Sequence, residues 1–420
     1  MNEQIKQRIE QIRRGEVPEG YKKTKVGLVP EEWEIKKLSD ISDEIKEVAG
    51  TGKYETLSIS AGIGFVNQAN KFGKELSGKQ YEKYTVLRKG DFAYNKGNSK
   101  KYPQGCVYRL KDRDSAAVPN VFECFRIKEG NKNYIEQVFI SGFLNRQLSK
   151  KINHGVRDDG LLNLTGEDFY KSYIIIPPLP EQEKIAEILQ TQDKVIELQQ
   201  KKIDELKRLK KGYLSKMFPK KGCNVPEIRF PGFTDAWEQR KLGEIGSVSM
   251  CRRIFKEQTS ETGDIPFYKI GTFGAEPDAF ISRELFEEYK SKYPYPKKGD
   301  ILISASGSIG RTVEFAGNNE YFQDSNIVWL SHDERLSNSF LKCFYSVVKW
   351  AGIEGSTIKR LYNDNILNTV ICMPSVPEQE HIGLFFENLD NLITLHQRKP
   401  FLMKWRTSDA NRNQTNRLVL

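Results

Sequence analysis

Two groups of polar and basic residues, in loops next to predicted strands, carry side chains suited to contact with DNA. Asn, Ser, Lys and Arg side chains hydrogen-bond to base edges in the major groove, and Lys and Arg also pair with phosphates. The first group is Asn95, Lys96, Asn98, Ser99, Lys100, Lys101 and Tyr102, with Arg157 as a further candidate. The second group is Ser304, Ser306, Ser308 and Arg311, together with Lys359, Arg360, Asn363 and Asn365. Each residue alone is more simply a polar surface residue, but the loops as groups predict DNA contact.

A third set of residues could instead hydrolyse a phosphodiester. Asp278 after a proline, followed by Glu288 and Lys290, mimics a metal-dependent nuclease motif in which two carboxylates hold Mg²⁺ and a lysine orients water. However, Arg283–Tyr289 has the pattern of a helix, which is the wrong support for such a site. A metal-dependent endonuclease that uses Asp278, Glu288 and Lys290 is therefore the alternative and not the main prediction.

Other motifs give little support to catalysis in this chain. Gly73–Lys79 matches a phosphate-binding loop up to Gln80, which stands where a Ser or Thr would bind magnesium. The four histidines are scattered without metal-ligand spacing, and no Cys-x-x-Cys pair occurs. We therefore predict no catalytic residue, no metal site and no cofactor of this chain's own.

Composition favours a polyanionic partner. The 420 residues carry 66 basic and 56 acidic side chains, a formal net charge of +10. No apolar run approaches the ~20 residues of a membrane span, and the polar N-terminus does not resemble a signal peptide. Separated cysteines fit a reducing compartment, so we expect a cytoplasmic protein without membrane contact.

The elements that must position these residues occur twice. Pro177–Ile185 returns as Pro374–Ile382, each copy after an apolar run and before a helical pattern, and Trp33–Leu38 returns as Trp237–Leu242. The repeat predicts an α+β chain with two similar globular domains separated by long helices. The predicted segments are an N-terminal helix and linker (1–28), a first domain (29–176), a first long helix (177–219), a second domain (220–373) and a second helix (374–420).

Both helices carry apolar residues at alternating spacings of four and three. Such a seam needs a partner helix, and the two helices of one chain would pair as an antiparallel coiled coil. The seam residues are Ile185, Leu189, Ile196, Ile203 and Leu206 in the first helix and Ile382, Phe386, Leu389 and Ile393 in the second. The simpler alternative is that each helix packs only on its own domain. A helix over Glu181–Phe218 would be about 57 Å long, whereas one DNA turn is about 34 Å, so domains at its two ends would contact separate half-sites.

The second helix departs from the first near its end. Pro400 cannot lie inside a helix without a kink, and no heptad continues from Arg406 to Leu420, so the helix is altered after Lys399. Ile5, Ile9 and Ile12 have the same four-then-three spacing. We expect this N-terminal helix to dock beside the end of the second helix.

These features together resemble the specificity (S) subunit of type I restriction-modification enzymes. The resemblance rests on the two Pro-Glu-Gln-Glu junctions, the paired tryptophan openings, Leu209–Phe218 and Gly299–Ser304. It implies that the two globular parts are target-recognition domains, each binding one half of a gapped, bipartite site in double-stranded DNA. It also implies that the helices dock two modification (methyltransferase) subunits. Restriction subunits, which translocate and cut DNA, would complete the complex.

By the same resemblance this chain is the non-catalytic part of a site-specific deoxyribonuclease and adenine methyltransferase. S-adenosylmethionine, magnesium and ATP would then belong to the partner subunits. The altered end of the second helix departs from the family pattern, and by the resemblance it would affect the contact with one modification subunit. A coiled-coil adaptor without DNA recognition is the remaining alternative. It would show weak, salt-insensitive DNA binding, whereas phosphate contacts make affinity fall steeply with salt.

Overall fold

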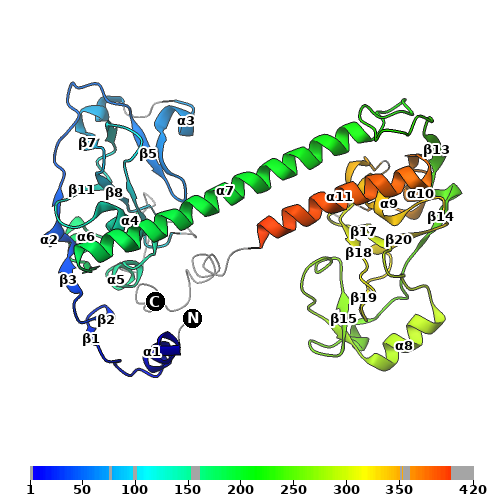
Figure 1. Ribbon diagram of the computed structural model, residues 1–420, viewed down its shortest axis with the longest axis horizontal. Coiled ribbons are helices and arrows are strands. Elements are labelled where there is room, and N and C mark those ends of the chain that lie inside the picture. The colour runs from blue at the N-terminus through cyan, green and yellow to red at the C-terminus, as the bar shows by residue number, and fades with distance from the viewer. Residues whose placement is uncertain are drawn as a thin grey trace. The chain divides into compact units, whose positions relative to one another are not determined.

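The computed structural model describes residues 3–74, 78–97, 102–152, 161–350, 352 and 360–398. The chain forms two compact units that meet within one long helix: unit 1 ends at Leu198, and unit 2 comprises Gln199–Arg398. Both are mixtures of short strands and helices, as Figure 1 shows. None of the helices in the described part of the chain combines the length and apolar character needed to cross a membrane.

Unit 1 is built around a four-stranded antiparallel sheet of order β4-β11-β8-β9. The helix α4 supplies Tyr134, Ile135 and Val138 to a core with Phe92 and Phe125 of the sheet. The elements of unit 1 are α1 (Glu3–Arg13), β1 (Tyr21–Thr24), β2 (Gly27–Pro30), β3 (Glu34–Lys37), α2 (Leu38–Ile41), β4 (Ser42–Glu44), β5 (Leu57–Ser60), β6 (Gly64–Asn67), α3 (Gln68–Phe72), η1 (Gly78–Lys83), β7 (Thr85–Arg88), β8 (Phe92–Asn95), β9 (Cys106–Arg109), β10 (Ser115–Val118), β11 (Glu123–Ile127), α4 (Lys132–Ile140), α5 (Asn145–Ser149), α6 (Gly166–Tyr170), β12 (Tyr173–Ile176) and the first part of α7 (Leu179–Met217).

Unit 2 repeats this design with the sheet β14-β20-β17-β18, also antiparallel throughout. Ile301, Ile303 and Val328 of this sheet share a core with Phe340 of α9. Its elements after α7 are β13 (Glu238–Lys241), η2 (Leu242–Glu244), β14 (Gly246–Ser249), η3 (Lys256–Gln258), β15 (Ile265–Tyr268), β16 (Phe280–Ile281), α8 (Arg283–Lys292), β17 (Ile301–Ser304), β18 (Thr312–Glu314), β19 (Tyr321–Phe322), β20 (Ile327–His332), α9 (Asn338–Val347), α10 (Asn363–Leu367), β21 (Val370–Met373) and α11 (Val376–Gln397).

The repeated Gly-Asp turn before the central strand has the same structure in both units. Gly90 and Gly299 each have φ +92°, a left-handed conformation that glycine adopts without steric cost. The following carboxylates accept a hydrogen bond from the amide three residues earlier, at 2.7 Å for Asp91 and 2.7 Å for Asp300. The repeated residues therefore specify the backbone and are not themselves candidates for DNA contact.

The predicted repeat and helices are confirmed. The apolar runs before the two junctions are β12 and β21, which pair antiparallel with the strands that follow the two tryptophans, β3 and β13. The first long helix was expected over Glu181–Phe218 and spans Leu179–Met217. The second ends at Gln397, consistent with the clash that a proline imposes on the residues before it. Residues 399–420 lie outside the described part of the chain.

Candidate nucleic-acid interface and its support

The glutamine that follows each Pro-Glu junction fastens the start of the long helix to the neighbouring helix of the same unit. In unit 1, Gln182 accepts a hydrogen bond from the amide of Asn131, the N-cap of α4, and donates to the carbonyl of Pro177, both at 2.8 Å. In unit 2, Gln379 accepts from the amide of Ser337, the N-cap of α9, at 2.8 Å. Both side chains are buried. We call Gln182 and Gln379 the junction glutamines.

Gln379 makes one bond more than Gln182. Its amide nitrogen donates to the carbonyls of Arg335 at 2.9 Å and of Pro374 at 3.0 Å. A buried amide that satisfies several backbone groups at fixed geometry restricts how the two elements can move against each other. The junction glutamines therefore hold the start of each long helix against the N-terminus of a neighbouring helix of the same unit.

The glutamates beside the junction glutamines have different partners in the two units. Glu181 accepts a hydrogen bond from the indole Nε1 of Trp33 at 2.9 Å. The equivalent Glu378 is fully buried and forms a bidentate ion pair with Arg229, with both N···O distances 2.7 Å. The indole Nε1 of Trp237 is consequently buried without a hydrogen-bond partner.

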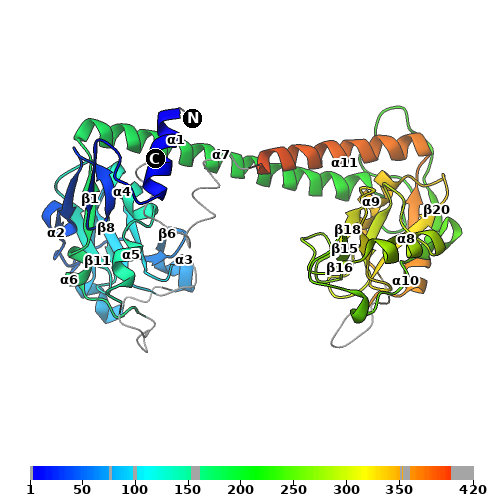
Figure 2. The ribbon, with the colours of Figure 1, turned by 90° about the horizontal axis from the view of Figure 1, so that it is seen from below.

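The predicted antiparallel pairing of the long helices is confirmed within unit 2. Tyr213 of α7 meets Phe385 of α11 edge to face, with ring centroids 5.2 Å apart. Lys210, one turn earlier in α7, binds both carboxylate oxygens of Asp390, one turn later in α11, at 2.6 and 2.8 Å. The two helices therefore run in opposite directions, side by side in Figures 1 and 2.

The predicted seam residues fall into two classes. In unit 2, Ile382 and Phe386 lie in the core of their own domain with Phe340 of α9, so the simpler alternative is correct there. Leu389 packs against this core, and Ile203, Leu206 and Ile393 are also buried. In unit 1, Ile185 packs on the core of its own domain, so the simpler alternative is correct at this position. Pairing of the half-buried Leu189 and Ile196 stays a prediction, as does docking of α1 beside α11.

In unit 1 an isolated bridge lies between the described residues that border two groups of candidates in the sequence. Gly97 forms an isolated antiparallel bridge with Leu161, and the amide of Leu162 donates to the carbonyl of Lys96 at 2.9 Å. Residues 98–101 follow the first strand of this bridge and residues 153–160 precede the second. The candidates Asn98, Ser99, Lys100, Lys101 and Arg157 lie outside the described residues.

Two described candidates in unit 1 have partners within the fold, and their contact with DNA stays a prediction. The Lys96 ammonium lies 2.9 Å from the Glu123 carboxylate, and both side chains are less than one-fifth exposed. The side-chain oxygen of Asn95 accepts a hydrogen bond from the amide of Gly97 at 2.8 Å, next to the bridge that Gly97 forms. Tyr102 is half-buried, and its contact with DNA stays a prediction.

Unit 2 contains the equivalent bridge. Ser306 pairs antiparallel with Arg360, and the amide of Leu361 donates to the carbonyl of Ala305 at 2.8 Å. The loop that begins at Ser306 therefore starts next to Arg360. Lys359 lies outside the described residues.

Three serine and asparagine candidates in unit 2 are engaged in hydrogen bonds within the fold, so their contact with DNA stays a prediction. Ser304 is buried and accepts the amide of Arg311 at 2.9 Å, and the Ser306 hydroxyl is buried and donates to Asn326 at 2.7 Å. Asn365 accepts the amide of Tyr362 and thereby caps α10. Ser308, Arg311 and Asn363 are exposed and Arg360 is half-exposed, so these four remain candidates.

The sequence reasoning missed the turn that enters β20. Asp324, Ser325 and Asn326 lie beside the bridged loops because Asn326 accepts from Ser306 and Ser325 accepts from Arg360. A run of Asp, Ser and Asn between two apolar segments is typical of a turn, which is the signal that could have found it.

The residues of the alternative nuclease motif do not converge. Asp278 pairs with Lys269 at 2.9 Å, and Glu288 pairs with Lys292 on α8 at 3.0 Å. The Lys290 ammonium instead lies over the ring of Phe286, 5.0 Å from its centroid. Among the described residues no group of three or more His, Cys, Asp or Glu side chains is placed to hold a metal ion.

Nucleophilic chemistry has little support among the buried thiols. Burial raises the pKa of Cys106 to about 11 and the pKa values of Cys251 and Cys343 to about 12. These thiols are therefore protonated at neutral pH, whereas a nucleophilic cysteine needs its thiolate.

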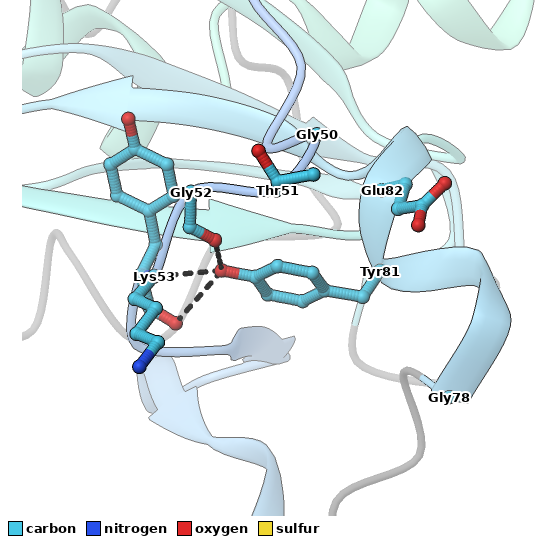
Figure 3. A pocket seen from close by; sticks show the side chains of 8 residues that line it. Gly50, Thr51, Gly52, Lys53, Gly78, Tyr81 and Glu82 are labelled. Atoms are coloured by element: carbon cyan, nitrogen blue, oxygen red, sulfur yellow. Dashed lines mark hydrogen bonds between the residues drawn. The ribbon is translucent and has the colours of Figure 1, made fainter.

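A hollow of about 630 Å³ lies in unit 1 between the segments 50–54 and 78–82. Figure 3 shows the Tyr81 ring pointing across it towards Gly52 and Lys53. The Tyr81 hydroxyl donates to the carbonyl of Gly52 at 2.8 Å and accepts the amide of Tyr54 at 2.7 Å. Its hydrogen-bonding capacity is thus used to hold this turn, and the hollow shows no convergent catalytic set.

Comparison with known proteins agrees with this architecture. The sequence pattern of the type I restriction modification DNA specificity domain matches residues 30–208 and again residues 234–401. A Haemophilus influenzae protein whose name describes it as a type I restriction enzyme specificity subunit is 61% identical over 158 residues, which cover 37% of this chain and 41% of that protein. The MjaIX specificity subunit of Methanocaldococcus jannaschii is 24% identical over 428 residues, covering 91% of this chain and 93% of that protein.

Solved structures share the fold. The crystal structure of the type I restriction-modification S subunit from M. genitalium matches with a TM-score of 0.55 at 15% identity, over 87% of this chain and 91% of that one. The two matched segments together cover most of the sequence and coincide with its internal repeat. The chain therefore belongs to the type I restriction-modification DNA specificity family.

Proposed function

We propose that this chain selects the DNA sequence on which a type I restriction-modification complex acts, with each unit recognising one half of a two-part site. The observation that carries the proposal is the pair of equivalent bridges, Gly97–Leu161 and Ser306–Arg360, each of which lies at or beside candidate residues in the sequence. Since the frame is repeated and the loop residues differ, the two half-sites should differ in sequence. The nuclease alternative is not favoured, because Asp278, Glu288 and Lys290 have separate partners.

We further propose that the helix pair docks two modification subunits. Support comes from apolar side chains that are exposed along both long helices and are available to a partner. They are Ile188, Val195, Leu198 and Leu209 of α7 and Leu384, Leu392 and Leu395 of α11. Restriction subunits would join this assembly. S-adenosylmethionine, magnesium and ATP would act in the partners, and this chain would hold no cofactor.

The decisive experiment is co-expression with a modification subunit in a host without DNA methylation, followed by genome-wide mapping of methylated adenines. We expect one gapped motif with two unlike halves. If no methylation appears, the chain is tested again with the heptad continued past Pro400. Recovery would trace the loss to the altered end of the second helix, and continued absence would contradict the proposal.

Salt dependence separates DNA recognition from the adaptor alternative. The affinity of the co-expressed complex for its two-part duplex should fall by about 10³–10⁵ between 50 and 200 mM salt if six to ten phosphates are contacted. A scrambled duplex of the same length is the control. An affinity that stays flat with salt would favour an adaptor.

A further inference from the structure

The turn that enters β20 has a strained backbone next to the candidate loops of unit 2. Ser325 has φ +53° and is the one residue other than glycine with a positive φ among the residues that the structure describes. Such a conformation is uncommon for serine, and it persists where surrounding contacts determine it. Here Asn326 is bonded to Ser306, and Ala305 donates its amide to the Asn326 carbonyl at 2.8 Å.

In this conformation the Ser325 hydroxyl contacts the side chain of Arg360. The Arg360 guanidinium donates through Nη2 to the hydroxyl of Ser325 at 3.0 Å and lies 6.0 Å from the ring centroid of Tyr362. The backbone of Arg360 is fixed by its bridge to Ser306. A guanidinium group has five N–H donors, so one hydrogen bond to Ser325 leaves the others free to donate to a ligand.

The surroundings of Arg360 suit an encounter with duplex DNA. Arg253, whose side chain is 67% exposed, lies with its Nε 4.0 Å from an Asp324 carboxylate oxygen. The exposed ring of Tyr362 and the exposed amide of Asn363 follow directly after the bridge. A preformed arginine fork among exposed polar groups matches the commonest specific contact to DNA, the bidentate bond to O6 and N7 of guanine.

The same position differs in unit 1. The bridge there is formed by Leu161 in place of Arg360. Glu123 of β11, which pairs with Lys96, lies opposite Tyr94 in the sheet of unit 1. The equivalent residue of unit 2 is Val328 of β20, which lies opposite Ile303. Unit 2 therefore has an apolar residue where unit 1 has the acidic partner of Lys96. The arginine fork is therefore a feature of one unit and not of the repeated frame.

From these contacts we propose that Arg360 recognises a guanine in the half-site of unit 2 and that Ser325 is the residue that positions it. The inference rests on the proposed function and deepens it. Ser325 acts through Arg360 and does not itself contact the base. A turn that served only to connect β19 to β20 would need neither the hydroxyl of Ser325 nor the guanidinium of Arg360.

The test uses the full chain co-expressed with its modification subunit and a duplex library randomised at both half-sites. Arg360→Ala should reduce the preference for guanine at one position of one half-site by about 10- to 100-fold. Arg360→Lys retains the charge but not the fork, so it should lose the same preference while keeping the salt dependence of binding. The other half-site and the gap are the internal control.

Ser325 variants separate positioning from backbone strain. Ser325→Gly permits the positive φ and removes the hydroxyl, so it should reduce the guanine preference by about 3- to 10-fold without loss of thermal stability. Ser325→Asn tolerates this conformation and restores an acceptor, so it should retain most of the preference. Arg283→Ala, at an exposed arginine of α8, is the matched control and should change neither half-site.

The outcomes distinguish the two proposals. If the complex that contains the unsubstituted chain selects no two-part motif, the proposed function fails and this inference fails with it. If it selects two halves and the Arg360 and Ser325 variants leave both unchanged, this inference alone is overturned. Relaxation of one guanine position in one half, with the other half intact, would support both.

Discussion

The junctions of the two units share a backbone and differ in the chemistry that stabilises it. In unit 1, Glu181 receives the indole N–H of Trp33. In unit 2, Glu378 is buried with Arg229, and Trp237 instead packs edge to face against Phe218 and Phe340. The repeated residues therefore specify where each long helix starts. The side chains that stabilise this helix start differ between the two units.

The candidate DNA-contacting loops differ in the same way. Both units contain an equivalent bridge, but Leu161 occupies in unit 1 the place that Arg360 has in unit 2. The Lys96–Glu123 pair of unit 1 likewise has no counterpart opposite β17. A common frame with unlike loops allows two domains of one fold to recognise two different sequences.

The largest expected difference between the units concerns the ion pair of unit 2. Arg229→Ala leaves the Glu378 carboxylate buried without a counter-charge, which should lower the free energy of unfolding of unit 2 by about 3–5 kcal/mol. Amide hydrogen exchange of peptides from each unit measures this, because it resolves local stability in a chain of two units. Unit 1 peptides should exchange as before.

A matched control for Arg229 is the exposed Arg240, which pairs with Glu238 on the surface. Arg240→Ala should change the stability of unit 2 by no more than about 1 kcal/mol. Equal effects of the two substitutions would show that the buried pair is not special to the junction.

The next difference concerns the junction glutamines. Methionine has a similar length and volume but makes none of the three bonds of Gln379 or the two of Gln182. At about 1 kcal/mol for each lost bond, Gln379→Met should cost about 3 kcal/mol and Gln182→Met about 2 kcal/mol, each in its own unit. Denaturant unfolding followed by hydrogen exchange gives both values. Gln200→Met, on the exposed face of α7, is the control and should be nearly neutral.

A functional readout accompanies the glutamine variants. If the junction glutamines fix the angle between domain and helix, the substituted complex should accept a wider range of gap lengths in its DNA target at unchanged half-site sequence. A gap that stays sharply defined in both variants would limit these residues to a stabilising role.

Much of the architecture could be predicted from the sequence because it is encoded by repeated, local patterns. Apolar runs, prolines at helix starts and heptad spacing predicted β12, β21, α7 and α11 within a few residues. The pairing partner of α11 followed from the shared seam.

Individual contact residues could not be predicted in the same way. Whether a serine is exposed depends on backbone turns and on residues distant in sequence. The buried Ser306 hydroxyl donates a hydrogen bond to Asn326, and Lys96 forms an ion pair with Glu123 of a neighbouring strand. The loop as a group was recognisable from its composition, whereas Ser325 was missed because its role depends on a backbone conformation and on Arg360.

The smallest expected difference isolates one hydrogen bond. Trp33→Phe and Trp237→Phe remove the same ring volume from two buried sites, so the packing loss should be similar in both units. Only the first substitution also removes a hydrogen bond, since the Trp237 Nε1 has no partner to lose. Trp33→Phe should therefore destabilise the pairing of β3 with β12 by about 1 kcal/mol more than Trp237→Phe destabilises that of β13 with β21. Hydrogen exchange of the amides in these four strands measures both. Equal losses would mean that the Trp33–Glu181 bond contributes nothing to stability beyond what a bond from the indole to water supplies in the unfolded chain.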